Sequence, residues 1–185
     1  MDLRAHIEAI SPLTDAEWEF VSRHFTSRKF RKHQYLVQQG DPVPYDFWVA
    51  AGMVKAYVLD ENGKEHILQF AMEDWWCTDY NAYQTQTKAS IFIDCLENCE
   101  VLCLALKDRE KICKKVQAME RFFRIKSNLG YIALQKRIIS LLQDPAETRF
   151  RKLLKQYPRL AQRVPKKHLA AYLGVTRETL SRQKA

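Results

Sequence analysis

Residues 164–185, VPKKHLAAYLGVTRETLSRQKA, have the pattern of two short helices joined by a tight turn. Pro165 stands where a helix begins, because its missing N–H would lack a helical partner there in any case. Gly174 ends this first helix at a position that tolerates a positive φ. Small Ala170, Gly174 four residues on and apolar Leu180 six further on match the spacing of a helix-turn-helix, in which two helices approach closely.

The second helix, predicted over residues 177–182 with Thr176 as its N-cap, has one charged face. At about 100° per residue, that face spans an arc of about 140° and contains Arg177, Glu178, Ser181 and Arg182. Arginine pairs bidentately with guanine, and glutamate accepts a hydrogen bond from cytosine N4. A surface helix with a chance charge pattern is the alternative, but the complete unit in a basic C-terminal region favours a helix that reads the DNA major groove.

The composition is that of a soluble globular protein, with 46% hydrophobic and 28% charged residues. A chain of 185 residues accommodates one large domain or two small ones. No apolar run is long enough to span a membrane, and the N-terminal residues lack a signal-peptide core. We therefore expect a cytoplasmic protein without a membrane partner.

Charge is distributed unevenly along the chain. Residues 1–106 contain 9 Lys and Arg against 16 Asp and Glu, a net charge of −7. Residues 107–185 contain 21 against 6, a net charge of +15. A basic half of this kind suits a polyanion, since phosphate contacts supply most non-specific affinity for DNA. We expect Lys166 and Lys167 to contact phosphates.

The middle of the chain predicts an antiparallel sheet. Two helical stretches come first, residues 2–10 and a helix opened by the capping box Thr14–Glu17 and continuing through Phe25. Short β-branched and aromatic runs follow, and Asn62-Gly63 between two of them is a strong hairpin signal. The segment between residue 70 and the next strand is expected to be irregular. The fold class predicted is α+β, with an N-terminal antiparallel β-barrel or jelly roll.

From Lys107 the chain is predicted to be helical as far as Pro145, and the later part has an apolar seam. Its members recur at spacings of three and four residues, except where Lys136 interrupts the seam: Phe122, Ile125, Leu129, Ile132 and Ile139. Such a stripe also suits an intramolecular core face. Because a DNA reader follows, we favour a homodimer helix. The predicted domains are a sensor barrel (1–115), a dimerisation helix (116–143) and a helix-turn-helix domain (144–185), with a hinge at residues 143–146.

Barrel, long helix, hinge and terminal helix-turn-helix together resemble the Crp/Fnr family of bacterial transcription regulators. The most specific matches are RETLSR at residues 177–182 and the barrel glycines Gly40 and Gly52. The resemblance implies a cyclic-nucleotide-binding-like barrel and a homodimer bound to a palindromic double-stranded DNA site, with RNA polymerase as a further partner. It assigns base contacts to Arg177, Glu178 and Arg182, and phosphate contacts or caps to Thr176 and Thr179. The family often continues beyond this helix, where only residues 183–185 follow here.

The barrel departs from the family at the effector pocket. In members that bind cyclic AMP, a Gly-Glu pair holds the phosphate and a ribose hydroxyl, and an Arg-Ser pair clamps the phosphate. A gap-free count places Thr78, Asp79, Ala89 and Ser90 at those positions. Neighbouring Lys88 cannot reproduce an arginine's planar fork, and Tyr80 adds bulk. We expect a degenerate pocket that does not bind cyclic AMP, and favour a filled, ligand-free pocket over one for another small ligand.

No enzymatic or metal-site motif is present. The histidines are scattered, and no P-loop, GxSxG or HExxH occurs. The five cysteines lack the close pairs typical of iron–sulfur ligands, and inert buried thiols are favoured over a redox sensor. We expect no enzyme activity, metal or cofactor. A regulator gated by a cyclic nucleotide or another small ligand, and a redox-sensing regulator, remain the alternatives.

Overall fold

The computed structural model describes residues 2–182 and divides into two compact units. The first unit contains Met1–Ala56 and Phe70–Asn128, and the second contains Tyr57–Gln69 and Leu129–Ala185. The second unit therefore combines the C-terminal helices with the tip of a hairpin from the central part of the chain.

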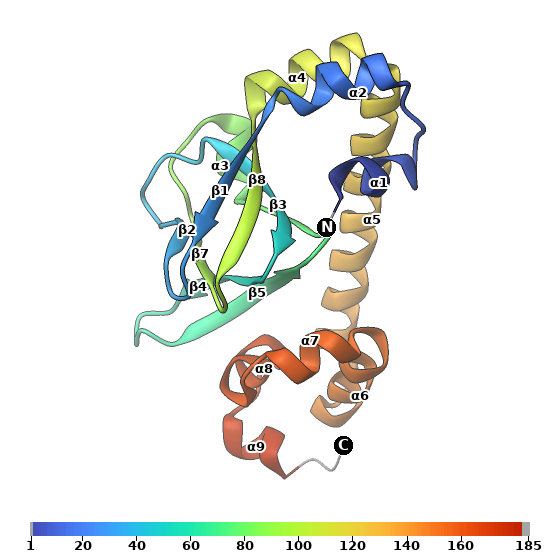
Figure 1. The fold of residues 1–185 in the computed structure, drawn as a ribbon. Helices are drawn as coiled ribbons and strands as arrows, with labels where there is room; N and C mark the ends of the chain where they lie inside the picture. The colour runs from blue at the N-terminus through green and yellow to red at the C-terminus, as the bar shows by residue number, and fades with distance from the viewer. Residues whose placement is uncertain (1, 183–185) are drawn as a thin grey trace. The chain divides into compact units, whose positions relative to one another are not determined.

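The strands of the described residues form two four-stranded sheets. One has the order β1-β8-β3-β6 and the other β2-β7-β4-β5. Their bounds are β1 (Phe25–Phe30), β2 (Tyr35–Val37), β3 (Tyr45–Ala51), β4 (Met53–Leu59), β5 (Glu65–Met72), β6 (Trp76–Cys77), β7 (Phe92–Cys95) and β8 (Cys99–Ala105). The paired strands β1 and β8 are antiparallel, from Phe25 opposite Leu104 to Phe30 opposite Cys99 (Figure 1). The predicted fold class is confirmed.

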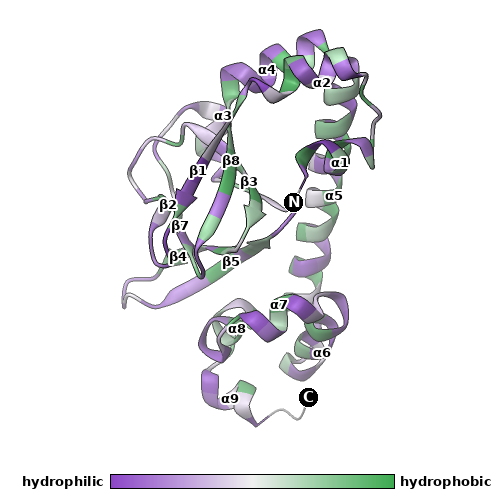
Figure 2. Cartoon of the chain, viewed as in Figure 1, coloured by the Kyte–Doolittle hydropathy of each residue, from purple (hydrophilic) through white to green (hydrophobic). Residues whose placement is uncertain are grey.

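Hydropathy explains which strand lies at the sheet edge. In Figure 2, β1 is hydrophilic over most of its length, whereas its neighbour β8 is largely hydrophobic. The four central residues of β1 are exposed, and Arg28 and Lys29 are among them. Charged side chains on an edge strand discourage pairing with another chain, so β1 is a protected edge.

Gly52 is required by a close approach of two turns. It has φ +94°, and a Cβ atom there would lie 2.4 Å from the carbonyl oxygen of Asn98 and 2.7 Å from Sγ of Cys99. A larger residue would clash with the connection between β7 and β8, besides adopting a backbone conformation that favours glycine.

The helices follow the predicted boundaries in some places and depart from them in others. Their bounds are α1 (Leu3–Glu8), α2 (Asp15–Ser22), α3 (Tyr80–Thr85), α4 (Leu106–Lys115), α5 (Gln117–Gln143), α6 (Ala146–Gln156), α7 (Pro158–Arg163), α8 (Lys166–Leu173) and α9 (Arg177–Ser181). The capping box between Thr14 and Glu17 is present as predicted, with both reciprocal hydrogen bonds. It fixes the start of α2.

Three local predictions were wrong. Phe25 begins β1 rather than continuing α2, because its strand pairs with β8. The segment expected to be irregular contains β6 and α3, whose first turn is capped by Asp79. The helical stretch after Lys107 is interrupted at Val116, whose extended backbone (φ −121°, ψ 100°) separates α4 from α5.

Candidate nucleic-acid interface and effector pocket

The turn between α8 and α9 has the predicted geometry. Gly174 is left-handed with φ 68°, and its N–H donates to the carbonyl groups at the end of α8. The N–H of Val175 donates to the carbonyl oxygen of Ala170 at 3.0 Å. Thr176 is the N-cap of α9, and its hydroxyl accepts a hydrogen bond from the N–H of Thr179 at 3.1 Å. Glycine and cap together fix the direction in which α9 leaves the turn.

One side of α9 anchors it while the rest faces outward. Leu180 is buried, as are Leu169 and Leu173 on α8. All the side chains predicted to meet DNA are exposed: Arg177, Glu178, Ser181 and Arg182 on the reading face, Thr176 and Thr179 at the cap, and Lys166 and Lys167 at the start of α8. The structure therefore brings the predicted base-reading residues together on one exposed surface.

Glu178 is ionised on this surface. Its own backbone N–H and the hydroxyl of Thr176 donate to its carboxylate, and Arg177 and Arg182 lie nearby, so its pKa is below the ordinary value. A charged carboxylate can accept hydrogen bonds but cannot donate them. The face thus offers two guanidinium donors and one acceptor.

Arg149 supports this arrangement from α6. Its Nη2 and Nε donate to the carbonyl oxygen of Leu173 at 2.8 and 3.1 Å, and its Nη1 donates to the carbonyl oxygen of Asp144 at 2.7 Å. The last carbonyl groups of a helix have no partner within the helix, so this guanidinium completes the end of α8. Sequence reasoning missed Arg149, since its acceptor on Leu173 lies 24 residues away.

A second arginine in this unit joins the β4–β5 hairpin to α8. Arg137 on α5 donates from Nη2 to the carbonyl oxygens of Ile67 (2.8 Å) and Tyr172 (3.0 Å), and its guanidinium lies 3.6 Å from the centre of the Tyr172 ring. Nearby, His168 and Glu65 approach to 3.3 Å. These contacts, also absent from the sequence-based predictions, hold the hairpin against the helix that precedes the turn.

The predicted effector residues also come together, in the first unit. Asp79 caps α3, and its Oδ1 accepts the N–H of Ala82 at 3.1 Å. Its Oδ2 accepts both the N–H and the hydroxyl of Ser90, at 2.7 and 2.8 Å. Burial alone would raise the pKa of this carboxyl, but the donors from Ser90, Ala82 and Ile91 outweigh it and the pKa is lowered. Asp79 is therefore a buried, charged and fully hydrogen-bonded carboxylate.

The other residues predicted for the pocket differ in their burial and in their partners. Thr78 is buried and donates its hydroxyl to the carbonyl oxygen of Tyr45 at 2.8 Å. Ala89 is buried, whereas Lys88 is exposed and forms an isolated bridge with Pro42. Tyr80 is partly exposed, and its side chain forms a hydrogen bond with Asp46. No described residue supplies a guanidinium to Asp79 or Ser90.

Asp46 was not among the predicted residues. It is buried, and Nη1 of Arg109 lies 3.5 Å from its Oδ2. Burial raises its pKa to about 7, although the arginine opposes the shift. No local pattern marks this pair, which joins β3 to α4.

The apolar seam of α5 changes character along the helix. Phe122 is fully buried by its own chain among Trp76 and Phe123, and it is therefore removed from the predicted dimer interface. Ile125 is half-buried, and Leu129, Ile132 and Ile139 are exposed. Further exposed apolar residues extend the same region: Tyr131, Leu134, Ile138, Leu141 and Leu142.

The cysteines are all free, and Cys113 alone among them is half-buried rather than buried. Burial raises the pKa of Cys77 to about 12 and that of Cys103 to about 11. These two thiols are thus protonated at neutral pH, a state that reacts slowly. Within residues 2–182, no group of His, Cys, Asp and Glu side chains is arranged to hold a metal ion. Across the same residues, every helix is too short or too polar to cross a membrane.

The chain consists of two sheets, a long helix and a terminal helix-turn-helix, and its fold is similar to that of several solved structures. Similar structures include FixK2 from Bradyrhizobium japonicum (TM-score 0.74, 19% identity, covering 85% of this chain and 81% of that one). The c-di-GMP-responsive global regulator CLP of Xanthomonas campestris also has a TM-score of 0.74, at 13% identity over 91% and 89% of the two chains. A Crp/Fnr-family regulator from Eubacterium rectale has a TM-score of 0.69, at 15% identity over 92% and 81%.

A family model described as the cyclic nucleotide-binding domain matches residues 27–116. No curated protein matches the chain significantly. The chain thus contains a cyclic nucleotide-binding domain and has the fold of the Crp/Fnr regulators, which confirms the family resemblance predicted from sequence.

Proposed function

We propose that this protein is a DNA-binding transcription regulator of the Crp/Fnr type, not an enzyme, and that it works in the cytoplasm as a homodimer. The observation that carries the proposal is the exposed face formed by Arg177, Glu178 and Arg182 on a helix anchored by Leu180. The names of the similar proteins support it, since two of them are described as regulators. RNA polymerase is the expected further partner.

The chemistry of that face specifies what it reads. The two guanidinium groups suit the O6 and N7 acceptors of guanine, and the ionised Glu178 suits the N4 donor of cytosine. Lys166 and Lys167, exposed at the start of α8, suit phosphates on either side. Each protomer would thus bind one half-site rich in G·C pairs.

The partner protomer is proposed to pack on the exposed apolar part of α5. Leu129, Ile132 and Ile139 repeat at spacings of three and seven residues, and they stand exposed on a helix whose first part is already covered. Packing against the same helix of a second copy would remove this surface from water. Ile132→Asp would bury two carboxylates in such a contact, so light scattering should then detect monomers; an intact dimer would refute this interface.

Cyclic AMP is not proposed as the effector. The serine that the family uses at the phosphate gives both of its donors to Asp79, and the position of the clamping arginine is Ala89. A cyclic phosphate would have to displace a charged carboxylate from its own donors. We propose that Asp79 takes the place of the ligand's anion and keeps the pocket closed.

A nucleotide-gated regulator is the second candidate, because the family model for cyclic nucleotide binding matches residues 27–116. Calorimetry with cyclic AMP separates the two candidates. Saturable micromolar binding would favour gating, and no heat at about 1 mM nucleotide would favour the closed pocket.

Selection of bound duplexes from a random pool tests the proposed function. The enriched sequences should contain a palindrome whose half-sites lie one helical turn apart, about 34 Å, or a multiple of that distance. Enrichment should be lost for the double variant Arg177→Ala/Arg182→Ala. Enrichment of no sequence at all by the natural protein would contradict direct readout.

A further inference from the structure

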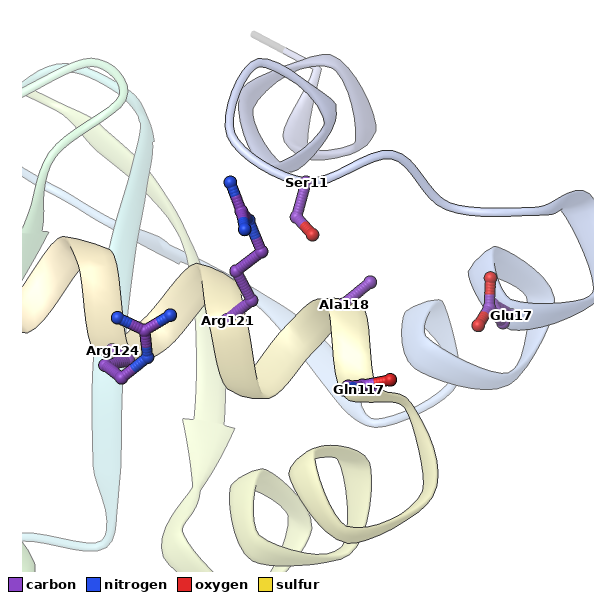
Figure 3. A pocket seen from close by; sticks show the side chains of 6 residues that line it. All are labelled: Ser11, Glu17, Gln117, Ala118, Arg121 and Arg124. Atoms are coloured by element: carbon purple, nitrogen blue, oxygen red, sulfur yellow. The ribbon is translucent and has the colours of Figure 1, made fainter.

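A polar pocket of about 390 Å³ lies away from both sites described above. It lies between the start of α5 and the segment that contains the α1–α2 connection and α2 (Figure 3). All of its lining residues belong to the first compact unit: Ser11, Glu17, Gln117, Ala118, Arg121 and Arg124.

One wall of the pocket is basic. Gln117, Arg121 and Arg124 follow each other at spacings of four and three residues, so they share one face of α5 within an arc of about 60°. Both arginines are exposed, and within the described residues neither one forms an ion pair. Planar guanidinium groups one turn apart suit the oxygens of a single phosphate group.

Two further donors point to the same ligand chemistry. Ala118 lies in the first turn of α5, where backbone N–H groups have no acceptor within the helix and favour an anion. Ser11 is only 3% exposed, and it lines the pocket. Figure 3 shows this hydroxyl directed toward Ala118, between the two elements. A hydroxyl in this position can donate a hydrogen bond to a phosphate oxygen.

The opposite end of the pocket is acidic. Glu17 lies on the far side from Arg124 (Figure 3), and its Oε2 accepts the N–H and the hydroxyl of Thr14, both at 2.8 Å. Those hydrogen bonds lower the pKa of the carboxyl, which is therefore ionised at neutral pH. A ligand with an anionic group at one end and a hydrogen-bond donor at the other could contact the arginines with the first and Glu17 with the second.

We propose that this pocket binds a small phosphate ester, with the phosphate on Arg121 and Arg124 and a ligand hydroxyl or amino group on Glu17. Such a ligand would connect the α1–α2 segment to α5, the helix that is also proposed to form the dimer. It would be an effector site outside the barrel. The barrel pocket itself is proposed to exclude an anion because of Asp79.

Calorimetry of the full chain with glycerol 3-phosphate, in a phosphate-free buffer, tests the proposal. The natural protein should bind with a dissociation constant of about 1 mM or below, and glycerol should not bind. Arg121→Gln/Arg124→Gln should weaken binding at least about tenfold, because both forks are lost. Ser11→Ala should weaken it about threefold. Arg31→Gln is the matched control, since Arg31 is an exposed arginine of the same unit, and it should have no effect.

Equal affinity of the double variant and the Arg31→Gln control would overturn the proposal, as would the absence of binding to the natural protein. Circular dichroism checks that the double variant folds, and Arg124→Gln alone replaces it if it does not. DNA binding by the double variant should be unchanged, so this inference can fail while the proposed function stands.

Discussion

The helices α9 and α3 both begin at a residue whose side chain caps the first turn, but the two caps have opposite consequences. Thr176 caps α9 with a neutral hydroxyl, and the charged groups of Arg177 and Arg182 remain exposed. Asp79 caps α3 with a carboxylate that also takes both donors of Ser90. One cap leaves the charged face exposed. We propose that the other keeps closed the pocket in which related proteins bind their ligand.

At α3, a bound phosphate would be repelled by the charge of Asp79 and attracted by the donors of Ser90, and the magnitudes decide between them. Two like charges about 4 Å apart repel by roughly 4 kcal/mol at an effective dielectric constant near 20. A net hydrogen bond contributes only about 1 kcal/mol. The repulsion between a phosphate at Ser90 and the carboxylate of Asp79 would therefore exceed the free energy gained from a hydrogen bond to the serine.

The largest expected effect is at the open face. Replacing Arg177 by alanine should reduce the affinity for the selected palindrome by about 1–3 kcal/mol per half-site, or roughly 2–6 kcal/mol for a dimer. The measurement is fluorescence anisotropy with the selected duplex and with a random one. An equal loss of affinity for both duplexes would mean that α9 binds DNA only as a basic surface, and it would contradict base recognition by this face.

The next effect concerns the closed site. Asp79→Ala removes the cap of α3 and leaves the Ser90 donors without their acceptor, which should destabilise the fold by about 2–4 kcal/mol in urea unfolding. Its pH dependence has a definite sign. Because the folded pKa is lowered, the carboxylate stabilises the protein above its unfolded pKa of about 4, and this contribution is lost as the pH falls through the folded pKa. A gap between natural protein and variant that persisted at low pH would contradict the charged cap.

How well each region could be predicted from sequence depends on the range of its interactions. The α8–α9 unit was predicted from Pro165, Gly174 and Thr176 because its caps join residues a few positions apart. Arg149 was missed because its acceptor on Leu173 becomes its neighbour only in the folded chain.

The closed site was only half predicted. Counting placed Asp79 and Ser90 in one pocket, but α3 was expected to be irregular, so the cap at Ala82 was missed. Phe122 illustrates a different limit. A periodic apolar seam predicts a buried face without specifying whether the same chain or a second copy covers it, and here the chain's own core covers Phe122.

A smaller effect is expected for the neutral cap. Thr176→Ala should cost about 1 kcal/mol of unfolding free energy, because one hydroxyl acceptor at the start of α9 is lost. Because the Thr176 hydroxyl also donates to the Glu178 carboxylate, a small part of this cost should disappear as the pH falls through the pKa of Glu178. The part that comes from capping the Thr179 N–H should persist at acidic pH, because a hydroxyl does not titrate there. Urea unfolding of both variants across pH compares them, and a cost at Thr176 that vanished completely at low pH would contradict the neutral cap.

The smallest effect is expected at the phosphate-facing lysines. Lys166→Gln should weaken specific and random duplexes alike and reduce the slope of log affinity against log salt by about 1 per site. Anisotropy titrations at several salt concentrations measure this. A loss confined to the palindrome would instead make Lys166 a base contact.

The affinity of the natural protein for its selected palindrome, measured with and without cyclic AMP, tests the contrast between open face and closed pocket most directly. We predict tight binding without the nucleotide and no change in its presence at about 1 mM, since Asp79 already accepts the donors of Ser90 and the α9 face is already exposed. DNA binding that appeared only after cyclic AMP was added would contradict both halves of this contrast.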